Sequence, residues 1–201
     1  MGDGFARAFL EETRALLAAL DTDDVERVVG VLAETRAAGG RVFFCGSGGG
    51  AGHASHAACD FRKLAGLEAY SVTDNVSELT ARINDEGWDT SYAAWLSSSR
   101  LRPGDCLFVF SVGGGDEDRA ISVNLVHAMR LAKERGASLV GVAGRDGGLL
   151  RQLADASVLI PTGDPGNVTA QTEGLQAVVW HLLVTHPALC AATPKWESVA
   201  P

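Results

Sequence analysis

The sequence predicts an α/β fold in which a parallel sheet of five strands lies between two layers of helices. Short apolar runs rich in Val, Leu and Phe alternate with longer segments of helical periodicity, and glycine-rich turns follow several of the runs. Hydrophobic residues make up 46% of the 201 residues, enough for a substantial core. Strands that are continuous apolar runs are buried on both faces, and parallel strands need helical crossovers. We therefore predict a three-layer αβα sandwich, preceded by two N-terminal helices.

The two N-terminal helices are expected from apolar residues at helical spacing in 5–20 and again in 25–32. Asp21–Asp23 separates the two segments and is suited to cap the second one. Gly39–Gly40 closes the second helix. The length is typical of one domain, so we predict a single domain over 1–201. Its parts are expected to be N-terminal helices in 1–40, an αβα core in 41–190 and a C-terminal tail in 191–201.

The strands are expected where apolar runs meet turn residues, at 42–45, 68–72, 106–110, 139–143 and 158–160. The helices between them are expected near 51–64, near 77–95 with a break at 84–87, near 121–131 and near 175–184. In such sheets, ligands bind beyond the carboxyl ends of the strands. Two of these ends are glycine-rich, Gly46–Gly50 after the first strand and Gly113–Gly115 after the third.

The most informative stretch is Arg41–Leu64, in which a strand enters the first glycine loop and a helix follows. Glycines let main-chain N–H groups approach a ligand, and a helix N-terminus adds partial positive charge. A phosphate group is therefore the favoured ligand. His56 and Asp60 are four residues apart, with His53 one turn before them, so they share a helix face. Such residues suit proton transfer, metal binding or an ordinary polar helix face, and His53 is expected to be exposed or capping.

Composition and charge exclude several classes of protein. The net charge of −8 argues against nucleic-acid binding, which requires a basic face. No run approaches the roughly 18 apolar residues of a membrane span, and residues 1–12 lack the pattern of a signal peptide. The four cysteines have no C-x-x-C spacing and indicate a reduced protein. We expect a cytoplasmic protein with no nucleic-acid or membrane partner.

The first glycine loop matches two nucleotide-binding patterns poorly or not at all. Residues 46–51 loosely fit the dinucleotide pattern G-x-G-x-x-A, but Glu68 and Asp74 are poor candidates for the acidic residue that should follow. A dinucleotide enzyme also leaves the second glycine loop unexplained. A P-loop is excluded because neither loop continues into G-K-[ST]. We therefore expect no nucleotide cofactor.

Five segments taken together resemble the sugar isomerase (SIS) domain, which is a flavodoxin-like fold. They are GSGGGAGHASH, TDNVSELTA, INDEGW, RPGDCLFVFSVGGG and QAVVWH, in this order along the chain. Within that domain the chain is identified as a divergent member of the phosphoheptose isomerases, which convert sedoheptulose 7-phosphate to D-glycero-D-manno/altro-heptose 7-phosphate. The resemblance implies an aldose–ketose isomerase that acts on a phosphosugar through an enediol(ate). It also implies a homotetramer with sites between subunits.

The resemblance further implies the roles of individual residues. Asp60 would be the catalytic base and His181 the catalytic acid. A divalent metal, zinc in several members, would be held by His56, Asp60, Glu173 and His181. On one straight helix Glu173 and His181 would lie about 12 Å apart, so sharing an ion requires Glu173 to precede the helix or to come from a neighbouring subunit. The substrate would be bound by Ser47, Gly48, Gly49, Gly50, Asp85, Ser111, Val112, Gly113, Gly114 and Asp116.

The chain departs from the family pattern at several of these positions. The family has glutamate where this chain has Asp60, and glutamine where it has Glu173. Serines that hold the phosphate are replaced at Gly50 and Gly113, and Asp116 stands where a hydroxyl is usual. The phosphate would then bind to main-chain amides, Ser47 and Ser111, with Arg62 or Lys63 as further candidates. Two alternatives follow: a non-catalytic sugar-phosphate sensor or adaptor, and an isomerase of another phosphosugar such as a pentose 5-phosphate or an octulose 8-phosphate.

Overall fold

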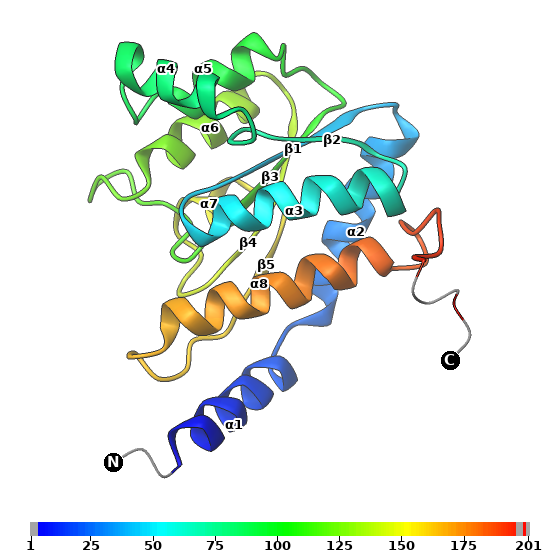
Figure 1. Ribbon diagram of the computed structural model, residues 1–201, viewed down its shortest axis with the longest axis vertical. Helices are drawn as coiled ribbons and strands as arrows, with labels where there is room; N and C mark the ends of the chain where they lie inside the picture. The colour runs from blue at the N-terminus through cyan, green and yellow to red at the C-terminus, as the bar shows by residue number, and fades with distance from the viewer. Residues whose placement is uncertain (1–3, 196–198, 200–201) are drawn as a thin grey trace.

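The computed structural model describes residues 4–195 and residue 199, and it contains a five-stranded parallel sheet (Figure 1). The strands are β1 (Arg41–Gly46), β2 (Glu68–Ser71), β3 (Cys106–Ser111), β4 (Ser138–Ala143) and β5 (Ala156–Leu159). They lie in the order β2-β1-β3-β4-β5, and every neighbouring pair is parallel. From β1 the chain adds β2 on one side of the sheet, and β3, β4 and β5 are then added on the other side. The direction of strand addition therefore reverses between β1 and β3, which is the topological switch point.

Helices cover both faces of this sheet, as the sequence predicts. They are α1 (Phe5–Ala18), α2 (Thr22–Ala37), α3 (Gly49–Leu64), α4 (Val76–Glu86), α5 (Ser91–Ser98), α6 (Val123–Glu134), α7 (Gly148–Leu153) and α8 (Val168–Thr185). One core cluster joins α2, α3 and α8 to one face, and a second joins α5, α6 and α7 to the other. Strand residues alternate between them, since Phe44 belongs to the first cluster and Phe43 to the second.

The αβα sandwich and the two leading helices are therefore confirmed, and the Asp21 side chain caps α2 by accepting from the Asp23 N–H at 2.9 Å. The sequence did not predict α7, because six residues that begin inside a glycine turn are too few to show helical periodicity. Helix α8 begins at Val168, before the apolar pattern expected from Leu175, because its first turns are largely polar. Strand β5 begins at Ala156 instead of residue 158.

The outer parts of the chain pack against this core. Helix α1 lies beside α8, below the sheet in the view of Figure 1. The start of the predicted tail is joined to the end of α3, because Ala191 and Ala192 donate to the Leu64 carbonyl at 2.7 and 3.1 Å. Residues 196–198 and 200–201 of that tail lie outside the described residues.

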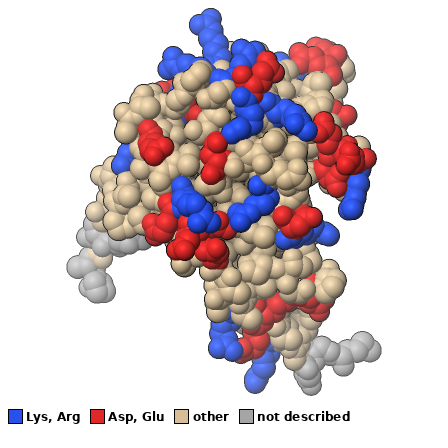
Figure 2. All heavy atoms as spheres, turned by 180° about the vertical axis from the view of Figure 1, so that it is seen from behind, with Lys and Arg blue, Asp and Glu red and all other residues tan. Residues whose placement is uncertain are grey.

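Charged side chains of both signs are intermingled on the face seen in Figure 2. Among the described residues, no helix combines the length and the apolar character that crossing a membrane requires.

Candidate active site

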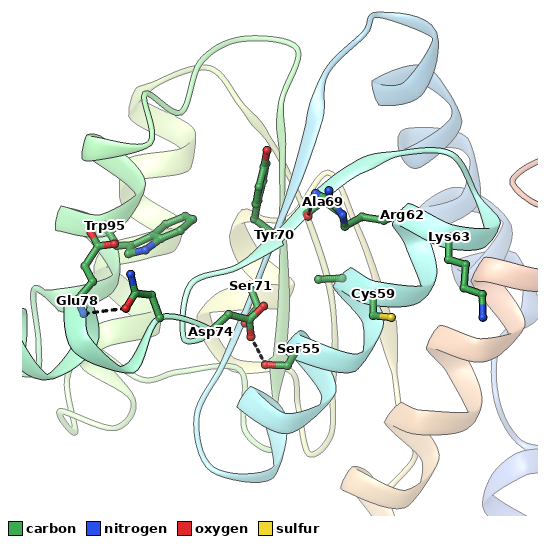
Figure 3. A pocket seen from close by; sticks show the side chains of 12 residues that line it. Ser55, Cys59, Arg62, Lys63, Ala69, Tyr70, Ser71, Asp74, Glu78 and Trp95 are labelled. Carbon is green, nitrogen blue, oxygen red and sulfur yellow. Dashed lines mark hydrogen bonds between the residues drawn. The ribbon is translucent and has the colours of Figure 1, made fainter.

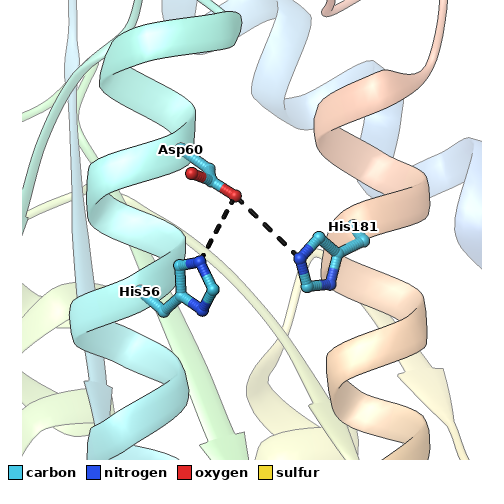
Figure 4. A group of neighbouring side chains, drawn as sticks. All are labelled: His56, Asp60 and His181. Atoms are coloured by element: carbon cyan, nitrogen blue, oxygen red, sulfur yellow. Dashed lines mark ion pairs between the residues drawn. The ribbon is translucent and has the colours of Figure 1, made fainter. Parts of the chain in front are cut away.

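Three of the predicted site residues meet where α3 and α8 run side by side (Figure 4). The Asp60 Oδ2 atom is 3.7 Å from His56 Nε2 and 4.0 Å from His181 Nε2. The Asp60 side chain is 18% exposed, and those of His56 and His181 are 61% and 51% exposed. This group, called the triad below, therefore combines a half-buried carboxylate with two imidazoles that a ligand from solvent can contact.

A buried tryptophan and a helix carbonyl orient the two imidazoles. The Trp180 ring, 1% exposed, has its centroid 4.7 Å from that of His56 and 3.4 Å from that of His181. His181 Nδ1 lies 2.7 Å from the Ala177 carbonyl oxygen. Because a carbonyl can only accept, Nδ1 carries the proton, and Nε2 is the nitrogen that faces Asp60.

The triad also has the composition of a metal site. The three donor atoms lie within 4.8 Å of one another. Two imidazole nitrogens and one carboxylate oxygen are a common set of protein ligands for a catalytic zinc ion, which keeps a further position open. The hydrogen bond from His181 to Ala177 is the kind of outer contact that fixes a ligating imidazole. The residues present therefore fit a divalent metal.

Glu173, the fourth predicted ligand, lies away from the triad. It is inside α8, and its carboxylate lies against Gly49 at the start of α3, where a Cβ atom would be 2.5 Å from Glu173 Oε2. A side chain at that position would require the Glu173 carboxylate to move. The first turn of α3 carries no acidic residue, so the Glu173 carboxylate supplies the negative charge that a helix N-terminus favours. Within one chain, the structure does not bring Glu173 to the triad.

His53 is half-buried, and the expectation that it is exposed or capping is wrong. Gly48 occupies the capping position of α3, and the His53 ring packs on Phe110 of β3 with the centroids 5.8 Å apart. Its Nε2 atom is buried and finds no hydrogen-bond partner among the described residues. Burial lowers the pKa of His53, and the nearby Glu173 opposes this shift.

A hollow of about 950 Å³ opens at the carboxyl ends of β1, β3 and β4, and we call it the strand-end hollow. Half of the residues predicted to bind substrate line it, namely Ser47, Ser111, Val112, Gly113 and Asp116. Of the others, Gly49 is covered by the Glu173 carboxylate, and Asp85 is exposed on α4, where it accepts from the Asn84 side chain at 2.8 Å. The structure does not place Gly48, Gly50 or Gly114 on the wall of the strand-end hollow.

One serine in the strand-end hollow keeps a free donor. Ser111 Oγ accepts from the Gly114 N–H at 3.0 Å, so its hydroxyl hydrogen is left for a ligand. Ser47 Oγ accepts from the Asn124 amide at 3.1 Å, and its hydroxyl also hydrogen-bonds to Tyr92, so both of its hydrogen-bonding roles are taken by the protein.

Two residues of the strand-end hollow were missed by sequence reasoning. Ser122 precedes α6, and Arg145 lies in the turn after β4; both line the hollow. The signal available for Arg145 was its position directly after a predicted strand, at the edge where ligands bind.

Arg62 and Lys63 line a different hollow, of about 910 Å³, between α3, β2 and α4 (Figure 3). Arg62 donates to the Ala69 carbonyl at 3.0 Å and packs over the Tyr70 ring at 5.4 Å from its centroid. Within one chain, the two basic residues therefore do not share a hollow with Ser47 and Ser111, so the same subunit does not bring all four residues to one phosphate.

Comparison with known proteins gives a consistent result. Residues 8–144 match the SIS domain family. The chain is 38% identical over 192 residues to the lincomycin biosynthesis protein LmbN of Streptomyces lincolnensis, covering 92% of this chain and 67% of that protein. It is 33% identical over 174 residues to a phosphoheptose isomerase of Rhodospirillum rubrum, covering 83% and 87%. The structure of phosphoheptose isomerase GmhA from Neisseria gonorrhoeae matches with a TM-score of 0.77 at 26% identity, covering 90% of this chain and 95% of that one.

Proposed function

The chain belongs to the SIS domain family and is a phosphosugar isomerase of the phosphoheptose isomerase group, and we propose that its substrate is sedoheptulose 7-phosphate. The product would be D-glycero-D-manno/altro-heptose 7-phosphate. The observation that carries this proposal is the triad, in which a carboxylate lies 4.0 Å from an imidazole that a sugar can contact.

Moving a carbonyl between C1 and C2 requires a proton to leave one carbon and another to arrive at its neighbour. We assign both tasks to Asp60, whose carboxylate takes the proton from one carbon as a general base and returns it to the neighbouring carbon. His181 moves the accompanying proton between the two sugar oxygens: its Nε2, which does not bond to Ala177, accepts the proton from the hydroxyl oxygen and gives it to the carbonyl oxygen. The two groups are close enough to act on adjacent carbons.

The same three residues, His56, Asp60 and His181, would hold the divalent metal, zinc by resemblance. His181 Nε2 would then bind the ion, so the proton transfer by His181 applies to the triad without metal. When bound, the ion polarises the sugar carbonyl and stabilises the developing enediolate charge. The Trp180 ring packs against both imidazoles beside Asp60.

The phosphate end of the substrate is assigned to the strand-end hollow, which Ser47 and Ser111 line and where Ser111 offers a free hydroxyl donor. Ser47, which lines this hollow, comes just before α3, and His56 in the triad lies seven positions after Gly49, the first residue of α3, which is roughly 10 Å along the helix. An extended sugar phosphate of seven or eight carbons can span that distance, and a pentose phosphate is at a disadvantage.

We propose a cytoplasmic homotetramer with sites between subunits. Phe5 and Leu10 on α1 are each 66% exposed, and Val178 and Leu182 on α8 are 44% and 39% exposed, so subunit contacts would cover apolar surface. Asp85, which lies outside the strand-end hollow of its own chain, would then reach a site from a neighbouring subunit.

The test is turnover of sedoheptulose 7-phosphate, a pentose 5-phosphate and an octulose 8-phosphate by the purified chain. Asp60→Asn and His181→Asn keep the side-chain size and should each reduce turnover at least ~100-fold. His186→Asn, at the C-terminal cap of α8, is the matched control and should retain turnover. Wild-type activity in Asp60→Asn would remove the assignment. Binding of these phosphosugars without turnover would favour the sensor or adaptor, and turnover of only the pentose or octulose phosphate would replace the proposed substrate.

A further inference from the structure

We propose that Arg145 is the side chain that binds the phosphate group of the substrate, in place of hydroxyl groups that the second glycine loop lacks. This inference rests on the proposed function and identifies the residue that would recognise the phosphate group of the substrate. The supporting observations are the position of Arg145, the charges around it and the hydroxyl group of Ser111 in the same hollow.

Arg145 is an exposed residue whose stem passes close to the second glycine loop. It follows Gly144 at the carboxyl end of β4, lines the strand-end hollow, and its Cδ would lie 3.7 Å from a Cβ on Gly113. Main-chain hydrogen bonds join this turn to the loop, because Gly144 donates to Val112 at 3.1 Å and Leu150 donates to Gly114 at 3.0 Å. The aliphatic part of the Arg145 side chain therefore lies at a part of the hollow where main-chain hydrogen bonds fix the two loops to each other.

The charge of Arg145 is available to a ligand. Three arginines line the strand-end hollow, and two of them are already paired: Arg119 with Asp116 at 3.4 Å, and Arg130 with Glu117. Among the described residues, no carboxylate or carbonyl accepts a hydrogen bond from the Arg145 guanidinium. A planar guanidinium can bind two phosphate oxygens at once, which a lysine cannot do.

The remaining carboxylates of the hollow leave this role to Arg145. Asp146 is bonded to the start of α7, where its Oδ1 accepts from the Gly148 N–H at 3.1 Å. Asp118 lies between Glu117, which pairs with Arg130, and Arg119, which pairs with Asp116. Carboxylates suit the hydroxyl groups of a sugar and disfavour its phosphate, so the unpaired Arg145 is the favoured contact for the phosphate on this wall.

The backbone around the hollow is strained. Within the described chain, four residues other than glycine have positive φ: Arg100, Ala120, Ser122 and Arg145. Ser122 (φ 53°) and Arg145 (φ 55°) both line the hollow, and Ala120 lies between lining residues. Left-handed backbone is unfavourable for such residues and is retained mainly where function requires it. This agrees with a ligand site at this place.

A hydroxyl donor completes the site. Ser111, 8% exposed, keeps its hydroxyl hydrogen for a ligand, as described above. A guanidinium and a hydroxyl that line one hollow provide directed donors for a phosphate dianion.

The test compares Arg145→Asn with Arg100→Asn. Asparagine accepts left-handed backbone more readily than arginine, so both variants should fold. Arg100 has the same φ of 55° but lines another hollow, beside Arg41, which makes it the matched control. Calorimetry would measure binding of sedoheptulose 7-phosphate and of inorganic phosphate, and kinetics would give KM and kcat for the phosphorylated and unphosphorylated sugar.

We expect Arg145→Asn to weaken binding of sedoheptulose 7-phosphate and to raise its KM roughly 10- to 100-fold, with kcat within about twofold. Arg145→Lys should recover part of this loss, and reaction of the unphosphorylated sugar should be unaffected. Unchanged binding in Arg145→Asn, or an equal loss in Arg100→Asn, overturns the proposal while the isomerase function stands. If the wild type binds phosphosugar without turnover, the proposed function fails and the binding data still decide the role of Arg145. If the wild type binds neither sedoheptulose 7-phosphate nor inorganic phosphate, the role of Arg145 is overturned.

Discussion

The geometry of the triad predicts that zinc stabilises the folded chain. Two of its donor pairs are 3.7 and 4.0 Å apart, and all three donors lie within 4.8 Å. A tetrahedral zinc ion with ligands at about 2.0–2.2 Å holds neighbouring donors about 3.3–3.5 Å apart. The donors must therefore approach by less than about 1.5 Å, which half-exposed imidazoles achieve by side-chain rotation.

The size of the effect follows from mass action. At a free zinc concentration 100 times the Kd, the folded state gains about 2.7 kcal/mol. For a chain of this length, each kcal/mol corresponds to a rise in Tm of about 2–4 °C. We therefore expect Tm to rise by about 5–11 °C when zinc is added to the chelator-treated protein.

Thermal unfolding followed by circular dichroism would measure this shift over a zinc titration. His56→Asn and His181→Asn each remove one donor and should abolish most of the rise, whereas the control His186→Asn should retain it. The reasoning is refuted if Tm does not respond to zinc. It is equally refuted if His56→Asn responds as strongly as the wild type, because the ion would then bind elsewhere.

Two further predictions concern stability. Burial lowers the pKa of His53 below its ordinary value of about 6.5, so between the folded pKa and pH 6.5 the unfolded chain binds more protons than the folded chain. The contribution of His53 to the free energy of unfolding should therefore be fully present above about pH 6.5 and be lost as pH drops through the folded pKa. Urea unfolding should show a smaller loss of stability on acidification in His53→Gln than in the wild type, and an equal loss in both would contradict this account. Asp105 is fully buried and accepts from Arg41 Nη2 at 2.6 Å, so Asp105→Ala should cost about 3–5 kcal/mol by removing the salt-bridge partner of the largely buried guanidinium. The exposed pair of Glu11 with Arg14 is the control, since Glu11→Ala should cost below about 1 kcal/mol in the same urea assay.

Most of the fold was predictable because strand and helix periodicities are local. The runs around Phe43, Phe108 and Val140 are buried on both faces of the sheet, as continuous apolar runs indicate. The short helix α7 was missed because its six residues cannot show a period. The start of α8 was missed because its polar first turns carry no apolar pattern.

The site was predictable only in part. The i,i+4 spacing of His56 and Asp60 placed them on one helix face, and the family resemblance pointed to His181 as their partner. The positions of Glu173 and His53 depend on how α8 and β3 pack against α3, which no local pattern records. Likewise, the contact of Arg145 with the second glycine loop depends on the folding of a turn 30 residues further along the chain.

The central claim is that Asp60 moves a proton between neighbouring carbons of a phosphosugar, and turnover in deuterium oxide tests it most directly. The Asp60 side chain is partly exposed, so a proton held there exchanges with solvent. We predict that the wild-type product carries solvent deuterium at the carbon that receives the proton, and that Asp60→Asn forms this product at least ~100-fold more slowly. A wild-type product free of solvent deuterium, or Asp60→Asn turning over at the wild-type rate, would contradict the account.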